Sequence, residues 1–261
     1  MHMRIRNSTF AALALVLCLP LLAVGCGGRR SATSGQDAAK AHALVERASA
    51  TLGTCLKGDP GIELRRVLAK ARGVLIVPDM GTAGFLFSVD TGNGVLFLRS
   101  DSGWTGPVFL TEASGGFGMQ AGFSNTSGVF VYTDADDVRY LLETGGVFQG
   151  RASVTVLNTN LKGKDTPKFV GAGDVYFVGD STGLYAGAAV HGGGLISRDY
   201  LNRAYYGSAD GDPEAILFKD TQKAPEDGLA LRARLAEAAV RGVRAQAPEA
   251  QKKDGAETPS K

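Results

Sequence analysis

Short apolar runs separated by glycine fill the middle of this chain and restrict it to a sheet-rich fold. Glycine accounts for 36 of the 261 residues, which is about twice its usual share. The glycines are spread between the apolar runs instead of being gathered in one linker. They therefore indicate tight turns and closely packed backbone. The run Val74–Val77 lacks alternation, which is typical of a strand buried on both faces.

The expected strands lie in the middle of the chain, with helices toward both ends. Helical spacing is found in residues 36–57, 62–72, 134–142, 199–206 and 224–244. Strands are expected at residues 74–77, 83–89, 95–99, 108–111, 117–123, 129–133, 151–157, 174–178 and 184–196. Residues 91–94 and 180–183 have the composition of hairpin turns. The predicted fold class is α+β: a curved antiparallel β-sheet or barrel-like sandwich with flanking N- and C-terminal helices.

The first residues of the chain resemble a bacterial lipoprotein leader. Arg4 and Arg6 precede an almost wholly apolar run, residues 10–24, which ends just before Cys26. The run is too short to cross ~30 Å of hydrocarbon comfortably, so it is typical of a cleaved secretory leader. Its last residues, Leu-Ala-Val-Gly-Cys, resemble a lipobox, in which the cysteine after the cleavage point is lipidated. An ordinary secretory peptide with a chance cysteine is the alternative.

These features predict the organisation of the chain. Residues 1–25 are expected to be a signal peptide, 26–35 an acylated cysteine and flexible tether, 36–207 the main domain, 208–245 an extension with an amphipathic helix, and 246–261 a disordered tail. Without the leader, 26 basic residues balance 26 acidic residues, which argues against a nucleic-acid partner. If Cys26 is acylated, Cys55 is the one remaining thiol. No intrachain disulfide can then form, and Cys55 is expected to be buried.

Two motifs suggest a hydrolase, but their context argues against one. Residues 179–183 match the nucleophile-elbow pattern around Ser181, and residues 191–194 match the oxyanion motif of esterases. The elbow requires a helix after the serine, whereas a strand pattern follows here. The oxyanion motif also comes after the serine, and no later histidine is left to act as the base. Residues 134–137 are expected to cap a helix, because they lack the Gly and Glu of a calcium loop. The sequence thus predicts a non-enzymatic protein with no cofactor and no metal.

An ordered set of motifs resembles the SYLF domain. The motifs are residues 71–78, 83–85, 94–96, 104–109 (Trp-Thr-Gly-Pro-Val-Phe), 115–122, 183–187 and 202–207 (Asn-Arg-Ala-Tyr-Tyr-Gly). SYLF domains are lipid-binding modules, with phosphoinositide recognition and actin association in eukaryotic members, and bacterial members are often exported lipoproteins. The resemblance, over residues 40–207, therefore implies lipid binding without catalysis. Thr82 departs from the family, because many relatives carry Lys there.

Five basic residues form the predicted lipid-binding site: Lys57, Arg65, Arg66, Lys70 and Arg72. They lie on or beside the second expected helix, and each cation near an anionic surface contributes ~1 kcal/mol. Arg72 also matches the basic residue that precedes the first strand in the family. The alternative is that these side chains form a solvated helix face without a ligand.

The favoured hypothesis is a lipoprotein held at the membrane through Cys26, whose domain binds anionic phospholipid headgroups. It would be exported to the cell envelope, on the periplasmic face, and to the outer membrane in a Gram-negative organism. The alternative is a structural or interaction protein of the cell envelope, with a protein or glycan partner that the sequence does not identify. The apolar stripe of the C-terminal helix distinguishes them, because a docked stripe favours a structural role and an exposed one favours a partner or membrane contact. The stripe consists of Leu229, Leu231, Leu235, Ala238, Ala239 and Val243.

Overall fold

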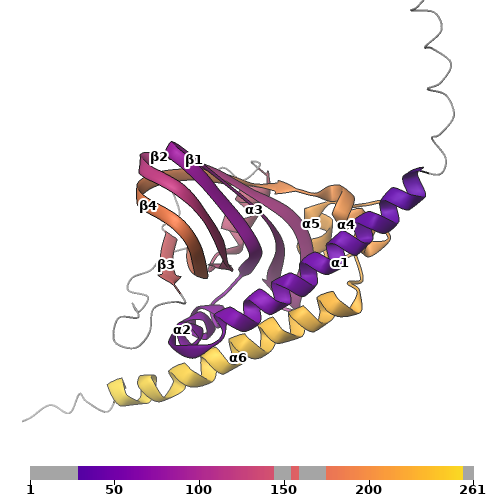
Figure 1. Cartoon of the computed structure of the whole chain (residues 1–261). Helices are drawn as coiled ribbons and strands as arrows, with labels where there is room; N and C mark the ends of the chain where they lie inside the picture. Colours follow the sequence, from indigo (N-terminus) through magenta and orange to yellow (C-terminus); the bar gives the residue numbers. More distant parts are fainter. Residues whose placement is uncertain (1–28, 144–153, 159–174, 255–261) are drawn as a thin grey trace, which may run out of the picture.

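The computed structural model describes residues 29–143, 154–158 and 175–254. The elements are α1 (Arg29–Cys55), α2 (Gly58–Leu68), β1 (Gly73–Ser100), β2 (Gly103–Tyr132), α3 (Ala135–Glu143), β3 (Val154–Asn158), β4 (Val175–Ser197), α4 (Asp199–Tyr206), α5 (Pro213–Leu217) and α6 (Glu226–Asp254). A strongly curved sheet forms one side of the molecule, and the long helices α1 and α6 lie together on the other (Figure 1). The predicted α+β class, with helices from both ends of the chain flanking a curved sheet, is confirmed.

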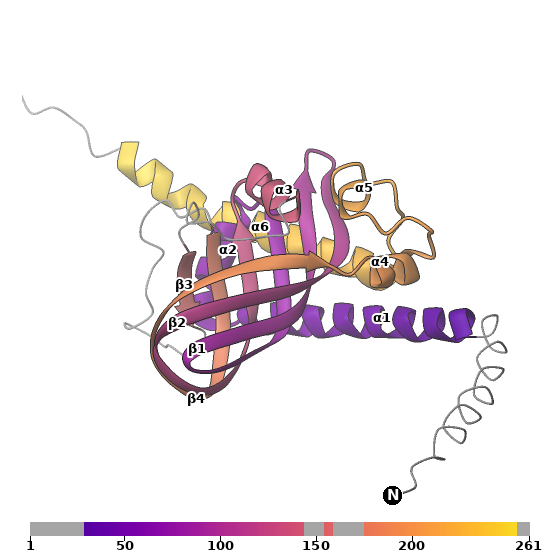
Figure 2. The ribbon, with the colours of Figure 1, turned by 90° about the horizontal axis from the view of Figure 1, so that it is seen from above.

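The sheet has the strand order β1-β2-β4-β3. β1 and β2 form one long antiparallel hairpin that closes at Ser100 and Gly103, and β4 pairs antiparallel with β2. The short β3 adds to β4 in parallel, which departs from the expected antiparallel pattern. The pairing of β1 with β2 shifts register between residues 77 and 80, 85 and 87, and 96 and 98. Such irregularities bend strands, and the long strands curve accordingly (Figure 2).

Both predicted hairpin turns are wrong. Residues 91–94 continue β1 and residues 180–183 continue β4, each paired with β2. β1 instead curls until its two halves meet, so that the Arg99 backbone N–H donates to the Arg72 carbonyl at 2.7 Å. A Cβ on Gly94 would lie 2.8 Å from the Ile76 carbonyl oxygen. This glycine therefore permits close approach of the backbone within the curl, and the chain reverses at residues 101–102.

The helix boundaries at the N-terminal side differ from the prediction. α1 begins at Arg29, so residues 29–35, which were expected to be part of a tether, are helical. α2 begins at Gly58, and the residues that were expected to break the helix form its first turn. Pro60 is compatible with this position, because the first backbone N–H groups of a helix need no partner within it.

Among the helices after β2, α3 and α4 agree better with the sequence prediction. α4 has the predicted bounds, and Asp134 caps α3 as predicted, with its carboxylate accepting from the Asp136 backbone N–H at 2.9 Å. The short α5 was not predicted. α6 continues to Asp254, although residues from 246 onward were expected to be a disordered tail.

The core has two apolar layers separated by the sheet. Val74 and Ile76 join one layer with residues of α1, α2, α4 and α6, while Leu75 and Val77 join the other with residues of α3 and α5. The prediction that residues 74–77 form a strand buried on both faces is therefore confirmed. Cys55 is also buried, as predicted, and its thiol lies 3.5 Å from the Val178 carbonyl oxygen.

Several predictions concern residues outside the ranges that the structure describes. They include the leader, Cys26, residues 151–153 of an expected strand, and the end of the tail at residues 255–261. Within the described ranges, no helix combines the length and apolar character needed to cross a bilayer.

Candidate functional site

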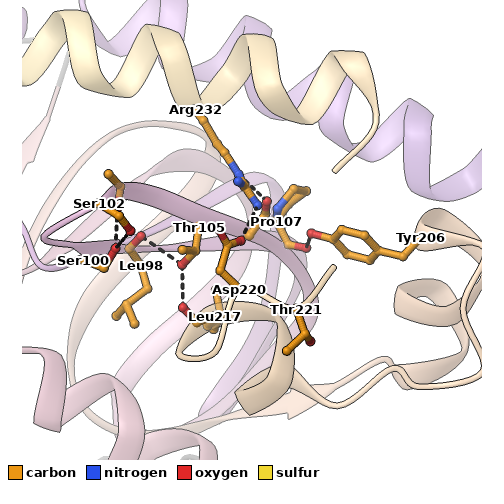
Figure 3. Close-up of polar contacts among 12 residues, drawn as sticks. Leu98, Ser100, Ser102, Thr105, Pro107, Tyr206, Leu217, Asp220, Thr221 and Arg232 are labelled. Atoms are coloured by element: carbon orange, nitrogen blue, oxygen red, sulfur yellow. Dashed lines mark hydrogen bonds and ion pairs between the residues drawn. The ribbon is translucent and has the colours of Figure 1, made fainter. Parts of the chain in front are cut away.

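Two of the motifs that carry the family resemblance meet in the structure. The Asn202 side chain accepts a hydrogen bond from the Phe109 backbone N–H at 2.8 Å and donates one to the Gly211 carbonyl at 2.9 Å. The neighbouring Tyr206 hydroxyl donates to the Pro107 carbonyl at 2.9 Å (Figure 3). Burial raises the pKa of Tyr206, so this hydroxyl keeps its proton and remains a donor. These motif residues attach α4 to β2.

The same region of β2 also bonds to α6 and to the end of α5. The Thr105 hydroxyl lies 2.6 Å from the Leu217 carbonyl oxygen, and the Arg232 guanidinium donates to the Gly106 carbonyl at 2.6 Å (Figure 3). Arg232 also lies 3.4 Å from the Asp220 carboxylate. Most of these side chains bond to backbone groups of another element, so the network holds the fold together and does not form a ligand site.

A second polar cluster joins α1 to the start of α6. The Asp227 carboxylate lies 2.8 Å from His42 Nδ1 and accepts a hydrogen bond from the Tyr205 hydroxyl at 2.8 Å. Burial alone would raise the pKa of Asp227, but the hydrogen bonds from His42 and Tyr205 outweigh it, and the pKa is lowered. Both neighbours bind the same carboxylate, unlike a catalytic triad, in which the imidazole accepts from a nucleophile. We call this cluster the α1–α6 clasp.

From the contacts of Asp227 in the α1–α6 clasp, we predict that part of the stability of the folded protein is lost in acid. Because the pKa of Asp227 is lower in the folded state than its usual 3.8, the stabilisation is present above that value and is lost as the pH falls through the folded-state pKa. We expect the free energy of unfolding of the wild type to decrease more steeply below about pH 5 than that of Asp227→Asn. Urea denaturation at a series of pH values measures this. Asp136→Asn, at an exposed position, is the control, and equal acid dependence in wild type and Asp227→Asn would contradict the prediction.

The five basic residues of the predicted site do not form a single surface. Lys57 is exposed at the start of α2, beside a groove between α1 and α6. Arg65 is half-buried and donates to the carbonyls of Leu56 at 2.7 Å and Gly61 at 2.9 Å, which fixes α2 to the end of α1. Arg66 pairs with Glu63 at 3.4 Å.

Lys70 and Arg72, by contrast, are exposed and line the same hollow. This hollow, of about 490 Å³, lies between residues 69–72, which follow α2, and residues 99–103, at the β1–β2 turn. We call it the basic hollow. The structure therefore brings together two of the five predicted residues.

Arg99 supplies a third cation to the basic hollow. Its guanidinium donates to the Ala69 carbonyl at 3.2 Å and lies 6.0 Å from the centroid of the Trp104 ring. Ser100 and Ser102 add two hydroxyls, which lie 2.8 Å from each other, and Asp101 is the one carboxylate in the lining. Three cations, two hydroxyls and one carboxylate give a positive site that suits an anion carrying several oxygen atoms.

Sequence reasoning did not identify Arg99 as a site residue. The polar sequence Arg99-Ser-Asp-Ser-Gly103 is a signal for a turn, but the turn was predicted at residues 91–94 instead. Because the turn was predicted elsewhere, Arg99 was not expected to lie near Lys70 and Arg72. Within the described ranges, no cluster of His, Cys, Asp and Glu side chains could hold a metal ion.

Comparisons with known proteins agree with the motifs. Residues 113–238 match the family described as "Ysc84: Las17-binding protein actin regulator". LAS seventeen-binding protein 3 of Saccharomyces cerevisiae is 33% identical over 145 residues, which are 54% of this chain and 31% of the relative. The SH3 domain-containing YSC84-like protein 1 of Xenopus laevis is 32% identical over 156 residues, which are 58% of this chain and 46% of the relative.

The chain thus spans less than half the length of these relatives. No solved structure matches it. The match nevertheless includes β4, α4 and most of β2. The Asn202–Gly207 motif lies within the matched residues, whereas Trp104–Phe109 lies before the first of them. Residues 113–238 of this chain therefore match the Ysc84 (SYLF) family, in agreement with the relatives that are 32–33% identical.

Proposed function

We propose that this protein is a non-enzymatic module that binds anionic phospholipid headgroups in the basic hollow. The observation that supports the proposal is the meeting of Lys70, Arg72 and Arg99 around an open hollow with a single carboxylate. Guanidinium groups pair with two phosphate oxygens at once, and an ammonium group acts as a point charge beside them. The Ser100 and Ser102 hydroxyls can donate to further oxygens of a headgroup.

Membrane anchoring is part of the same proposal. The leader resembles a lipoprotein signal, and α1 begins only three residues after Cys26. A diacyl anchor on Cys26 would hold the domain firmly, because each buried CH₂ adds ~0.8 kcal/mol. The basic hollow would then serve recognition of a headgroup, on the same membrane or a second one, and not attachment. We place the protein in the cell envelope of a bacterium on this basis.

The names of the relatives suggest a different activity. They describe Las17-binding proteins and an actin regulator, which is not a catalytic role. The chain covers less than half of these longer proteins, and an exported protein would not meet cytoplasmic actin. Headgroup binding is therefore the function that the geometry supports best.

A vesicle sedimentation assay tests the proposal. Residues 27–261, which contain every described element, are mixed with vesicles of phosphatidylcholine alone or with added phosphatidylglycerol. We expect preference for the anionic vesicles, and about 30-fold weaker binding for the double variant Lys70→Gln, Arg72→Gln, because each cation contributes about 1 kcal/mol.

The matched control is Lys57→Gln with Arg66→Gln. It removes the same charge from two predicted residues that lie outside the basic hollow. We expect this control to bind like the wild type. Equal binding of the wild type to neutral and anionic vesicles would refute the proposal, and an equal loss in both double variants would assign binding to general charge instead of the basic hollow.

A second candidate function is that of a structural or interaction protein of the cell envelope. One observation favours it: the predicted apolar stripe of α6 is only partly docked. Leu231 and Leu235 are buried in the core, whereas the exposed fractions of Leu229 and Val243 are 44% and 55%. An amphipathic stripe that is exposed in part is typical of a contact with another protein.

A further inference from the structure

The two walls of the basic hollow differ in the charge that they carry. The wall of residues 69–72, which follow α2, supplies Lys70 and Arg72 and no acidic side chain. The opposite wall is the β1–β2 turn, residues 99–103. Arg99 begins this turn, but its guanidinium donates to the Ala69 carbonyl at 3.2 Å. The positive charge of the basic hollow is therefore concentrated at the wall of residues 69–72.

The turn itself carries oxygen atoms that accept hydrogen bonds. Asp101 and Ser102 are exposed where the chain reverses, and the Ser102 hydroxyl lies beside that of Ser100 (Figure 3). Among the residues that the structure describes, the Asp101 carboxylate has no hydrogen-bond or ion-pair partner, although three cations line the same hollow. An ionised carboxylate accepts hydrogen bonds and cannot donate them. Asp101 is thus available to accept hydrogen bonds from a ligand.

Asp101 is an unfavourable neighbour for a ligand that is only a phosphate. Like charges that lie close together repel each other, so the carboxylate weakens the binding of a bare phosphate. A hydroxyl group, by contrast, donates to an ionised carboxylate in a charge-assisted hydrogen bond, which is roughly twice as strong as a neutral one. The lining therefore fits a ligand with a phosphate at one end and hydroxyl groups at the other.

An ammonium group on the ligand would also be attracted to Asp101, but the other side chains in the lining disfavour it. Lys70, Arg72 and Arg99 outnumber the one carboxylate, so the basic hollow as a whole repels a cation. A hydroxyl group is neutral and is not repelled. The charge balance thus favours a hydroxyl over an ammonium group as the donor to Asp101.

We propose that the basic hollow selects phospholipid headgroups in which the phosphate is esterified to a polyol, with Asp101 as the residue that determines this specificity. The inference rests on the headgroup binding proposed above. The phosphate pairs with Lys70 and Arg72, and hydroxyl groups of the polyol donate to Asp101. Ser102 can donate to or accept from a further hydroxyl. The hollow, of about 490 Å³, lies within the range of about 300–1,000 Å³ that is usual for small-molecule sites.

Two lipids of equal charge separate selection of hydroxyls from selection of charge. Phosphatidylglycerol and phosphatidylethanol each carry one phosphodiester, but only the former has hydroxyl groups in its headgroup. Residues 27–261 are sedimented with phosphatidylcholine vesicles that contain an equal share of one or the other. We expect the wild type to bind the phosphatidylglycerol vesicles about tenfold more tightly, because a hydrogen bond to a charged group is lost with phosphatidylethanol.

Asp101→Ala is expected to remove this preference. The variant should bind the two lipids equally, and it should bind phosphatidylethanol several-fold more tightly than the wild type does, because the repulsion of the phosphate is gone. An unfolded variant could not show that gain. The matched control is Asp59→Ala, because Asp59 is exposed in the first turn of α2 and lies outside the lining. It removes the same charge and should keep the preference for phosphatidylglycerol.

Soluble competitors repeat the comparison without a lipid tail. Glycerol 3-phosphate and ethyl phosphate have the same charge, and only the former has hydroxyl groups. Glycerol 3-phosphate should release the wild type from phosphatidylglycerol vesicles at about tenfold lower concentration than ethyl phosphate does. The two compounds should release Asp101→Ala at the same concentration.

The outcomes distinguish this inference from the headgroup binding on which it rests. Equal binding of the wild type to both anionic lipids, above its binding to phosphatidylcholine alone, would overturn the selection of hydroxyls and leave headgroup binding intact. Binding to neither lipid above that level would refute headgroup binding itself. A preference for phosphatidylglycerol that survives in Asp101→Ala would overturn the role of Asp101. Tighter binding to phosphatidylserine than to phosphatidylglycerol, lost in Asp101→Ala, would assign Asp101 to an ammonium group instead.

Discussion

Replacing Asn202 by alanine is expected to lower the free energy of unfolding by about 2–6 kcal/mol. Asn202 is fully buried and bonds to the Phe109 N–H and the Gly211 carbonyl. Removal of its amide leaves both backbone groups without that partner inside the protein, and each unsatisfied group costs about 1–3 kcal/mol. Since folded domains are stable by only about 5–15 kcal/mol, this one change removes a large part of the total.

Urea denaturation of residues 27–261 measures the effect. The matched control is Asn93→Ala, because Asn93 also makes two side-chain hydrogen bonds, with Thr111 at 2.9 Å and Arg198 at 2.7 Å, but is exposed. Water replaces those partners, so we expect a loss of less than about 1 kcal/mol. Similar losses for the two variants would show that the Asn202 amide is not a structural link.

Replacing Gly242 by alanine is the second change with a large expected effect. A Cβ at this position would lie 1.9 Å from the Arg65 carbonyl oxygen, where α6 crosses α2. The oxygen belongs to the backbone and the position of a Cβ is fixed by the backbone, so the helices must move apart. Overpacking of this kind costs about 1–3 kcal/mol and occasionally more. We expect a fall of about 2–3 kcal/mol in the free energy of unfolding, or roughly 4–12 °C in Tm.

Gly35→Ala is the control for this substitution. Gly35 also lies inside a helix, α1, but nothing stands within 4 Å of a Cβ added there. Alanine should stabilise that helix by about 0.5–1 kcal/mol, because glycine is the poorer helix former. Thermal denaturation followed by circular dichroism compares the two variants. A stabilised Gly242→Ala protein would show that α2 and α6 do not approach so closely.

The sequence predicted those features that depend on local pattern. The unbroken apolar run at residues 74–77 indicated a strand buried on both faces, and the structure confirms it. The bounds of α4 and the cap of α3 were also predicted, because helix spacing and capping residues act over a few positions. The α+β class followed from the many short apolar runs between helical ends.

The turns could not be predicted in the same way. Asn93-Gly94 favours a hairpin in isolation, but Gly94 is used where β1 curls against its own first half. That requirement comes from residues such as Ile76, far away in the chain. The true turn at residues 101–102 then decides which basic residues meet, since it carries Arg99 to Lys70 and Arg72.

The sequence by itself determined the class of the fold, the burial of Cys55 and the supply of basic residues after α2. Tertiary structure alone decided that Arg65 bonds to the Leu56 carbonyl, that Arg66 pairs with Glu63, and that Arg99 lines the basic hollow. It also decided that α6 buries some of its apolar side chains and exposes others. The physical reason is the range of the interactions. Hydrophobic spacing and capping are set by near neighbours in the chain, whereas the position of a side chain in a site depends on strand pairing and helix packing between distant segments.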